Sequence, residues 1–148
     1  MKLRHATLDD VPKLIALEKH AVTAAHWSDE QYRAVFSPSG PPRLALVLED
    51  ADAIPGFLIA RIAGPEWELE NIAIAGPARR RGLGTRLLGE FLTTARARGA
   101  TSVFLEVRES NSAARRLYER WAFCESGRRP AYYRDPEEAA VTYRLDFS

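Results

Sequence analysis

Glycines and arginines are concentrated in one turn of the sequence, and the composition of this turn suits phosphate binding. Arg79, Arg80 and Arg81 are followed by Gly82 and Gly84. The glycines let a backbone approach an anion closely, and guanidinium groups pair well with phosphate. Where such a turn opens a helix, the unpaired N–H groups of the helix start add to the site. The turn therefore predicts a diphosphate site, and a plain strand-to-helix turn with solvated arginines is the alternative.

The elements on both sides of the turn suit this role. The segment before it, Glu66–Ile74, alternates glutamates with apolar residues and predicts a strand with Glu66, Glu68 and Glu70 on one face. After the turn, apolar residues recur at helical spacing to about Arg98. Gly99 then stands where a helix-ending glycine is expected. The predicted helix thus begins at the basic turn.

Length and composition limit the class of protein. With 148 residues, 46% hydrophobic and 28% charged, the chain is expected to form one domain over residues 1–148. The net charge is +1, from 21 basic residues (18 arginines and 3 lysines) and 20 acidic residues, and it argues against a protein that coats a polyanion. One cysteine, Cys124, allows no internal disulfide and is expected to be a packed small residue. No apolar run approaching ~18 residues and no signal-like start is present, which predicts a cytoplasmic location and no membrane contact.

The remaining segments alternate between the two kinds of regular structure. Further strands are expected at Lys2–Ala6, Arg43–Glu49, Ile54–Ile62, Thr101–Val107, Phe123–Gly127 and Val141–Phe147. Further helices are expected after a capping box at Thr7 and Asp10 as far as about Ala24, from Ser28 to about Phe36, and from Asn111 to Arg120. The segment Arg128–Glu138 is predicted to be a long polar loop. This order predicts a mixed α/β fold.

A second motif follows the phosphate turn, between Leu105 and Phe123, and reads LEVRxSNxxAxxLYExxxF. With it go RRGLG in the basic turn, NIAI before that turn, WS at Trp27–Ser28 and YY at Tyr132–Tyr133. Together these motifs resemble the GNAT N-acetyltransferases along the whole chain, and among them the bacterial ribosomal-protein-alanine N-acetyltransferases. The sequence departs from that pattern at Ala75–Gly76, where Asp-Pro is common, and at Ala122, where glycine is usual.

The resemblance implies a central, mostly antiparallel, twisted sheet of about seven strands, flanked by about four helices and splayed at the acetyl-CoA site. It implies transfer of acetyl from acetyl-CoA to the N-terminal α-amine of a protein, the N-terminal alanine of a small-subunit ribosomal protein, by direct attack. No metal and no direct nucleic-acid contact are expected. A GNAT enzyme that acetylates a small-molecule amine and a non-catalytic acetyl-CoA-binding module are the alternatives.

The resemblance also assigns two catalytic residues. Glu106 matches the proton acceptor, and its alternative role is an ion pair with Arg108 or another arginine. An α-amine has a pKa of roughly 7.7 to 8, so a carboxylate can complete its deprotonation at modest cost. Tyr118 matches the proton donor, and its alternative is a core residue on the helix stripe. A phenol with a pKa near ~10 stays protonated and can protonate a departing thiolate.

The same resemblance implies two binding regions. Asn111 matches a pantetheine-binding asparagine, with a helix N-cap as its alternative role. The cofactor side comprises Ile72, Ala73, Ile74, Arg79, Arg80, Arg81, Gly82, Leu83, Gly84, Thr85, Arg86 and Asn111. The acceptor side comprises Trp27, Glu68, Glu70, Tyr132 and Tyr133, beside His26. Glu68 and Glu70 are either rival bases or an acidic wall for a basic N-terminal peptide.

Overall fold

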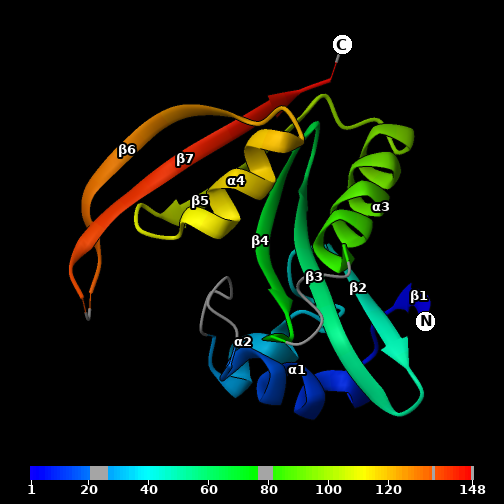
Figure 1. Cartoon of the computed structure of the whole chain (residues 1–148). Helices are drawn as coiled ribbons and strands as arrows, with labels where there is room; N and C mark the ends of the chain where they lie inside the picture. Colours follow the sequence, from blue (N-terminus) through cyan, green and yellow to red (C-terminus); the bar gives the residue numbers. More distant parts are fainter. Residues whose placement is uncertain (21–26, 77–81, 135, 148) are drawn as a thin grey trace.

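The chain folds into a seven-stranded sheet with helices on both faces, as the computed structural model shows (Figure 1). The structure describes residues 1–20, 27–76, 82–134 and 136–147. In chain order the elements are β1 (Lys2–His5), the 3₁₀ turn η1 (Leu8–Asp10), α1 (Val11–Glu18), α2 (Asp29–Ala34), β2 (Arg43–Asp50), β3 (Ala53–Ala63), β4 (Glu66–Ile74), α3 (Leu83–Ala97), β5 (Ser102–Arg108), α4 (Ser112–Arg120), β6 (Cys124–Tyr133) and β7 (Glu138–Asp146). The expected mixed α/β fold is confirmed.

The strands lie in the order β1-β2-β3-β4-β5-β7-β6. All neighbouring pairs are antiparallel except β4 and β5, which are parallel. A turn through Ala51 and Asp52 joins β2 to β3, and Ala51 takes a φ of 55° there. The mostly antiparallel arrangement agrees with the expectation from the sequence.

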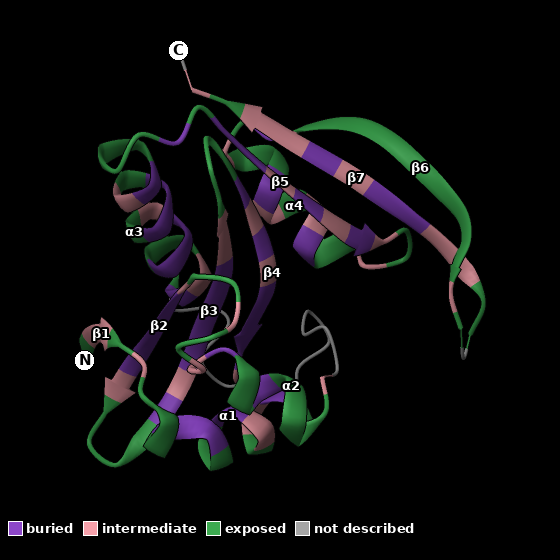
Figure 2. Ribbon diagram, turned by 180° about the vertical axis from the view of Figure 1, so that it is seen from behind, coloured by how far each residue is buried: buried purple, intermediate pink, exposed green. Residues whose placement is uncertain are grey.

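Two apolar clusters hold the helices against the sheet. α3 and α4 cover one face, where Leu87, Phe91 and Tyr118 pack against residues such as Trp67. α1 and α2 cover the other face, where Val11, Leu14 and Tyr32 contact Phe57. Because β2, β3 and β4 are covered on both sides, the middles of β2 and β3 and the end of β4, Asn71–Ile74, are continuously buried (Figure 2).

β4 and β5 pair over only a short stretch. The paired residues are Glu66 with Ser102, Trp67 with Val103, and Glu68 with Phe104. Beyond this stretch the two strands separate (Figure 1). Glu70 is an extra residue of β4, because the register with β3 passes from Leu69 to Asn71 opposite adjacent residues. Such a bulge bends a strand and increases its twist, and it lies directly after the last β4–β5 pair.

Three expected boundaries are wrong. α1 ends at Glu18 and not near Ala24, and residues 21–26 lie outside the described part of the chain. β6 runs over Cys124–Tyr133, where a short strand and a long polar loop were expected, and β7 begins at Glu138. The polar, proline-containing sequence of β6 has no apolar alternation, because nearly all of this edge strand is exposed. Cys124 is likewise exposed and not packed.

Candidate active site

The predicted cofactor residues line the opening between β4 and β5. Ile72, Ala73 and Ile74 are buried on β4 and pair with β3 on one edge. The other edge faces β5, with which β4 pairs no further than Glu68. Main-chain groups of a central strand are thereby brought to a place where a ligand can reach them, and this arrangement matches the expected splay.

α3 begins close to the end of β4. Gly82 is the N-cap of α3 with a φ of 71°, a left-handed conformation that favours glycine. A Cβ on Gly84 would lie 3.4 Å from Leu117 of α4 and 3.8 Å from Ile74 of β4, so the first turn of α3 sits close to both elements. Thr85 is exposed beside them. The first N–H groups of a helix have no partner within the helix, so a helix start at this place fits an anionic diphosphate.

The described part of the chain shows no contact that tests the role of the other predicted diphosphate residues. Arg79, Arg80 and Arg81 lie outside the described residues. Leu83 is buried in the core, and the exposed Arg86 donates to the carbonyl oxygen of Met1 at 3.2 Å.

Asn111 caps a helix in the structure. Its side-chain oxygen accepts a hydrogen bond from the Ala114 N–H at 3.2 Å, at the start of α4. The alternative role considered for this residue is thus observed, and a second role toward pantetheine stays a prediction.

Glu106 lies on β5 on the face of the sheet that carries the acidic residues of β4. Its Oε2 is buried and has no hydrogen-bond partner among the residues that the structure describes. Its Oε1 is 3.6 Å from the guanidinium of Arg129 on β6. A buried acceptor of this kind is uncommon in folded proteins and calls for an explanation. Proton abstraction from a bound amine provides one.

Arg108, the first alternative partner of Glu106, is engaged elsewhere. It donates to the carbonyl oxygens of Pro136 and Arg134, both at 3.1 Å, and pairs with Glu138 at 3.4 Å. Its guanidinium also lies 4.4 Å from the centre of the Tyr133 ring. Arg108 thereby pins the tip of the β6–β7 hairpin to β5. The arginine that meets Glu106 is Arg129.

Tyr118 is both a core residue and a candidate acid. The side chain is buried on α4, with ring centres 5.9 Å from Phe123 and 6.2 Å from Tyr143. Burial, and to a smaller degree Tyr133, raises the pKa of Tyr118 well above its ordinary value. The phenol therefore keeps its proton throughout the neutral and mildly alkaline range.

Tyr133 connects the two candidate catalytic residues electrostatically. Burial and the neighbouring Glu106 carboxylate raise the pKa of Tyr133 to about 12. The same phenol acts on Tyr118, as described above. The Tyr132 and Tyr133 rings meet edge to face, with centres 5.1 Å apart. The paired tyrosines at the end of β6 therefore border the space next to Glu106.

The two rival carboxylates on β4 differ in their surroundings. Glu70 accepts from the Arg43 guanidinium at 2.8 and 3.4 Å. Glu68 faces Arg61 at a longer 3.5 Å. Burial raises the pKa of Glu68, and the nearby Glu70 and Glu106 carboxylates add to the shift. The Glu106 carboxylate on β5 therefore lies close enough to Glu68 on β4 to raise the pKa of Glu68.

Trp27 is positioned by a buried hydrogen-bond network that the sequence did not reveal. The Trp27 backbone N–H and the Tyr32 hydroxyl both donate to Glu18 Oε1, the latter at 2.9 Å. Asn71 of β4 donates to the Tyr32 hydroxyl at 3.0 Å, and the Trp27 and Tyr32 rings lie 5.3 Å apart. The network ties the joint between α1 and α2 to the strand at the opening. His26 lies outside the described residues.

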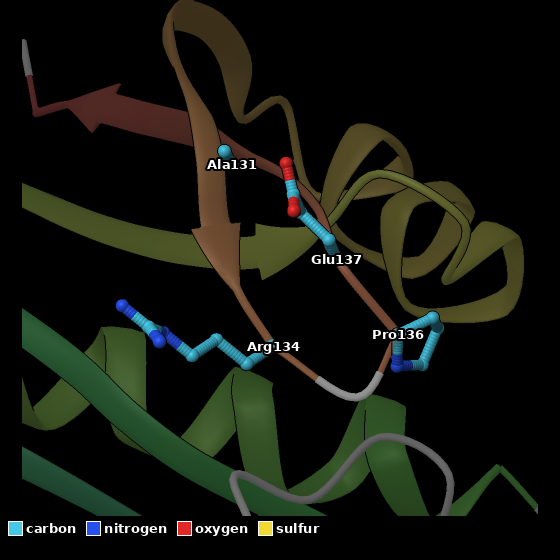
Figure 3. A pocket seen from close by; sticks show the side chains of 4 residues that line it. All are labelled: Ala131, Arg134, Pro136 and Glu137. Atoms are coloured by element: carbon cyan, nitrogen blue, oxygen red, sulfur yellow. The ribbon is translucent and has the colours of Figure 1, made fainter.

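A pocket of about 450 Å³ lies at the tip of the β6–β7 hairpin (Figure 3). Its lining residues are Ala131, Arg134, Pro136 and Glu137, and the Arg134 side chain points away from Glu137. This pocket adjoins Tyr132 and Tyr133 in the sequence. Within the described ranges, no group of three or more His, Cys, Asp or Glu side chains could hold a metal ion, and no helix is long and apolar enough to span a membrane.

Sequence reasoning missed Arg43, Arg129, Glu18 and Tyr32. The sequence did not indicate Arg129, because its segment was predicted to be a loop. The YY motif three residues later could have indicated that this segment lies near the site. Arg43 stands at the start of an apolar run and Glu18 stands between Leu17 and Lys19, and neither position identifies a partner.

The sheet, its opening and the helix start beside it are those of an acetyltransferase of the GNAT type. The model of the Acetyltransferase (GNAT) family matches residues 10–123, and the chain belongs to this family. It is 36% identical over 124 residues to the ribosomal protein bS18-alanine N-acetyltransferase of Salmonella typhimurium, covering 84% of this chain and 81% of that one. The Escherichia coli enzyme of the same name is 33% identical over 141 residues, covering 94% and 93%.

Solved structures agree with this assignment. The crystal structure of the ribosomal-protein-S18-alanine N-acetyltransferase from Escherichia coli matches with a TM-score of 0.89 and 30% identity, over 99% of this chain and 94% of that one. Ard1 from Thermoplasma volcanium matches with a TM-score of 0.87 at 22% identity, covering 99% of this chain and 97% of that one, a likeness of fold alone.

Proposed function

We propose that residues 1–148 form a single domain that acetylates the N-terminal alanine of a small-subunit ribosomal protein, with acetyl-CoA as the acetyl donor. The similarity to two enzymes named for this reaction, over most of both chains, supports the acceptor. The observation that carries the chemistry is the buried Oε2 of Glu106, which has no hydrogen-bond partner in the described part of the chain. Both proposed substrates place the reaction in the cytoplasm.

The cofactor side of the cleft fits a thioester joined to a diphosphate. Acetyl-CoA supplies the activated acetyl group. Ile72, Ala73 and Ile74 would orient the arm through the strand edge at the opening, with Asn111 at the start of α4 beside it. The amides of residues 82–86 and the arginines of the basic turn, Arg79, Arg80 and Arg81, would hold the diphosphate.

Glu106 would accept the proton of the acceptor amine, directly or through one water. The amine is mainly an ammonium ion at pH 7 and must lose a proton before it attacks. The unsatisfied oxygen of Glu106 is available for that proton without breaking an existing hydrogen bond. Tyr118, kept protonated by burial, would donate its proton to the sulfur as it leaves.

The acceptor side would be bordered by Trp27, Tyr132 and Tyr133 and by the carboxylates of β4. Glu68 gives a negative potential that suits a basic N-terminal segment, whereas Arg43 largely neutralises Glu70. We therefore assign Glu70 to the wall of the cleft and retain Glu68 as the rival of Glu106.

Mass spectrometry tests the proposal. The purified protein is incubated with acetyl-CoA and a peptide that begins with alanine and copies the start of the small-subunit ribosomal protein. We expect one added acetyl group at the α-amine and none on the same peptide with a blocked N-terminus. Transfer only to small amines in a parallel panel, or binding of acetyl-CoA without transfer, would contradict the proposed acceptor.

A further inference from the structure

Arg129 reaches Glu106 from the far side of β7. Directly paired residues of antiparallel strands point to the same face of a sheet. Arg129 of β6 pairs with Ala140 of β7, and Glu106 of β5 pairs with Thr142 of β7. Because Ala140 and Thr142 are small, the arginine side chain can cross β7 and bring its guanidinium to 3.6 Å from Glu106 Oε1.

The contact between the two charges is loose. A separation of 3.6 Å is longer than a hydrogen bond, and the Arg129 side chain is 62% exposed whereas that of Glu106 is 18% exposed. By comparison, Arg43 contacts Glu70 at 2.8 Å with both side chains largely buried. Arg129 therefore neutralises Glu106 without being locked to it.

The same guanidinium also lies beside an aromatic ring. The Arg129 guanidinium is 5.5 Å from the centre of the Tyr132 ring, within the range of a cation–π contact. The β6–β7 register shifts between Arg129 and Tyr133, and Ala131 has a φ of 51° there. This irregularity lies between Arg129, which meets Glu106, and Tyr133, whose pKa is raised by burial and then by the Glu106 carboxylate.

We propose that Arg129 is the resident counter-ion of Glu106 and that the ammonium group of the acceptor displaces it on binding. The inference rests on the proposed function, in which the acceptor amine must approach Glu106. An α-amine with a pKa of roughly 7.7 to 8 arrives mainly as a cation at pH 7. Two cations repel each other at one carboxylate, so the guanidinium moves toward Tyr132 and the competition weakens acceptor binding.

Steady-state kinetics with the alanine-first peptide tests the displacement. Arg129→Gln removes the competing charge, so we expect the KM for the peptide to fall about two- to five-fold, the size of an exposed ion pair. The KM for acetyl-CoA and the melting temperature should stay unchanged. Arg129→Lys keeps the charge and should restore the KM of the wild type.

Arg128→Gln is the matched control. Arg128 neighbours Arg129 on β6 and carries the same charge, but it pairs with Glu125 at 2.8 Å and with Glu109. We expect no change in the peptide KM for this variant. In a Glu106→Gln background, Arg129→Gln should no longer alter the peptide Kd measured by calorimetry with coenzyme A present.

Several outcomes would overturn the inference. A peptide KM that is unchanged or higher in Arg129→Gln means that the acceptor does not displace the guanidinium. A lower kcat at unchanged KM means that Arg129 stays beside Glu106 during the reaction. If the peptide KM falls equally in Arg129→Gln and Arg128→Gln, the effect comes from the change in net charge and not from the contact with Glu106. Absence of transfer by the wild-type protein contradicts the proposed function itself, and is thereby distinguished from these results.

Discussion

Arg43 and Glu70 form a two-contact ion pair across β3, from β2 to the bulge of β4. Arg43 Nε lies 2.8 Å from Oε1 and Nη2 lies 3.4 Å from Oε2 of Glu70. The two side chains are only 15% and 16% exposed. Glu70 is thus occupied by a partner that a substrate amine cannot easily replace. The choice of base therefore lies between Glu68 and Glu106.

Substitution of these two carboxylates distinguishes them. Glu106→Gln should lower kcat/KM for the peptide on the order of 10²- to 10⁴-fold at pH 7, because the amide cannot accept the proton. Glu68→Gln should keep kcat/KM within about three-fold of the wild type if its role is electrostatic attraction alone. The measurement is the initial rate of acetyl-peptide formation. The reverse pattern would move the base to Glu68.

Tyr118→Phe should separate catalysis from packing. The ring contacts with Phe123 and Tyr143 remain, so we expect the free energy of unfolding to change by less than about 1 kcal/mol. Loss of the proton donor should lower kcat on the order of 10²-fold. Urea unfolding and single-turnover rates measure the two effects. Full activity in this variant would leave Tyr118 with its core role only.

The raised pKa of Glu68 predicts a pH dependence of stability. The ordinary pKa of a glutamate is 4.5, and folding raises the pKa of Glu68 above it, first through burial and then through the Glu70 and Glu106 carboxylates. Between pH 4.5 and the raised pKa the folded protein therefore holds a proton that the unfolded chain has lost, and stability falls as pH rises through this range. Glu68→Gln abolishes this titration. Relative to the wild type, its free energy of unfolding should increase between pH 4 and pH 7.

Urea unfolding at both pH values checks this difference. Glu90→Gln, at an exposed position on α3, is the control and should follow the wild type. If both variants change equally with pH, the effect comes from net charge and not from the surroundings of Glu68.

Ala122 is strained where the related family has glycine. It follows the end of α4 with a φ of 69°, in the left-handed region. Ala122→Gly removes the Cβ clash and adds chain entropy to the unfolded state, for a net stabilisation of about 0.5–1 kcal/mol. Ala113→Gly, inside α4, should instead destabilise by up to about 1 kcal/mol. Thermal unfolding of both variants measures the contrast, and equal destabilisation would refute it.

The parts of the fold with periodic apolar patterns were predictable. Leu87, Phe91 and Leu92 repeat at helical spacing, and α3 was predicted to its end within one residue because Gly99 marks it. β6 was not predictable in this way, since no side of it is buried and its hydrogen bonds come from β7. The end of α1 also differed, because local propensity does not reveal where a helix must stop to let Trp27 pack.

The sequence by itself determined the order of strands and helices, the family and the candidate residues, because periodicity and the spacing of short motifs are local properties. Only the tertiary structure decided how those residues are paired. Arg43 neutralises Glu70, Arg108 holds the hairpin tip, and Arg129 meets Glu106. These partners come from strands far apart in the chain. Charges of either sign are common along it, so burial and register alone select which of them meet.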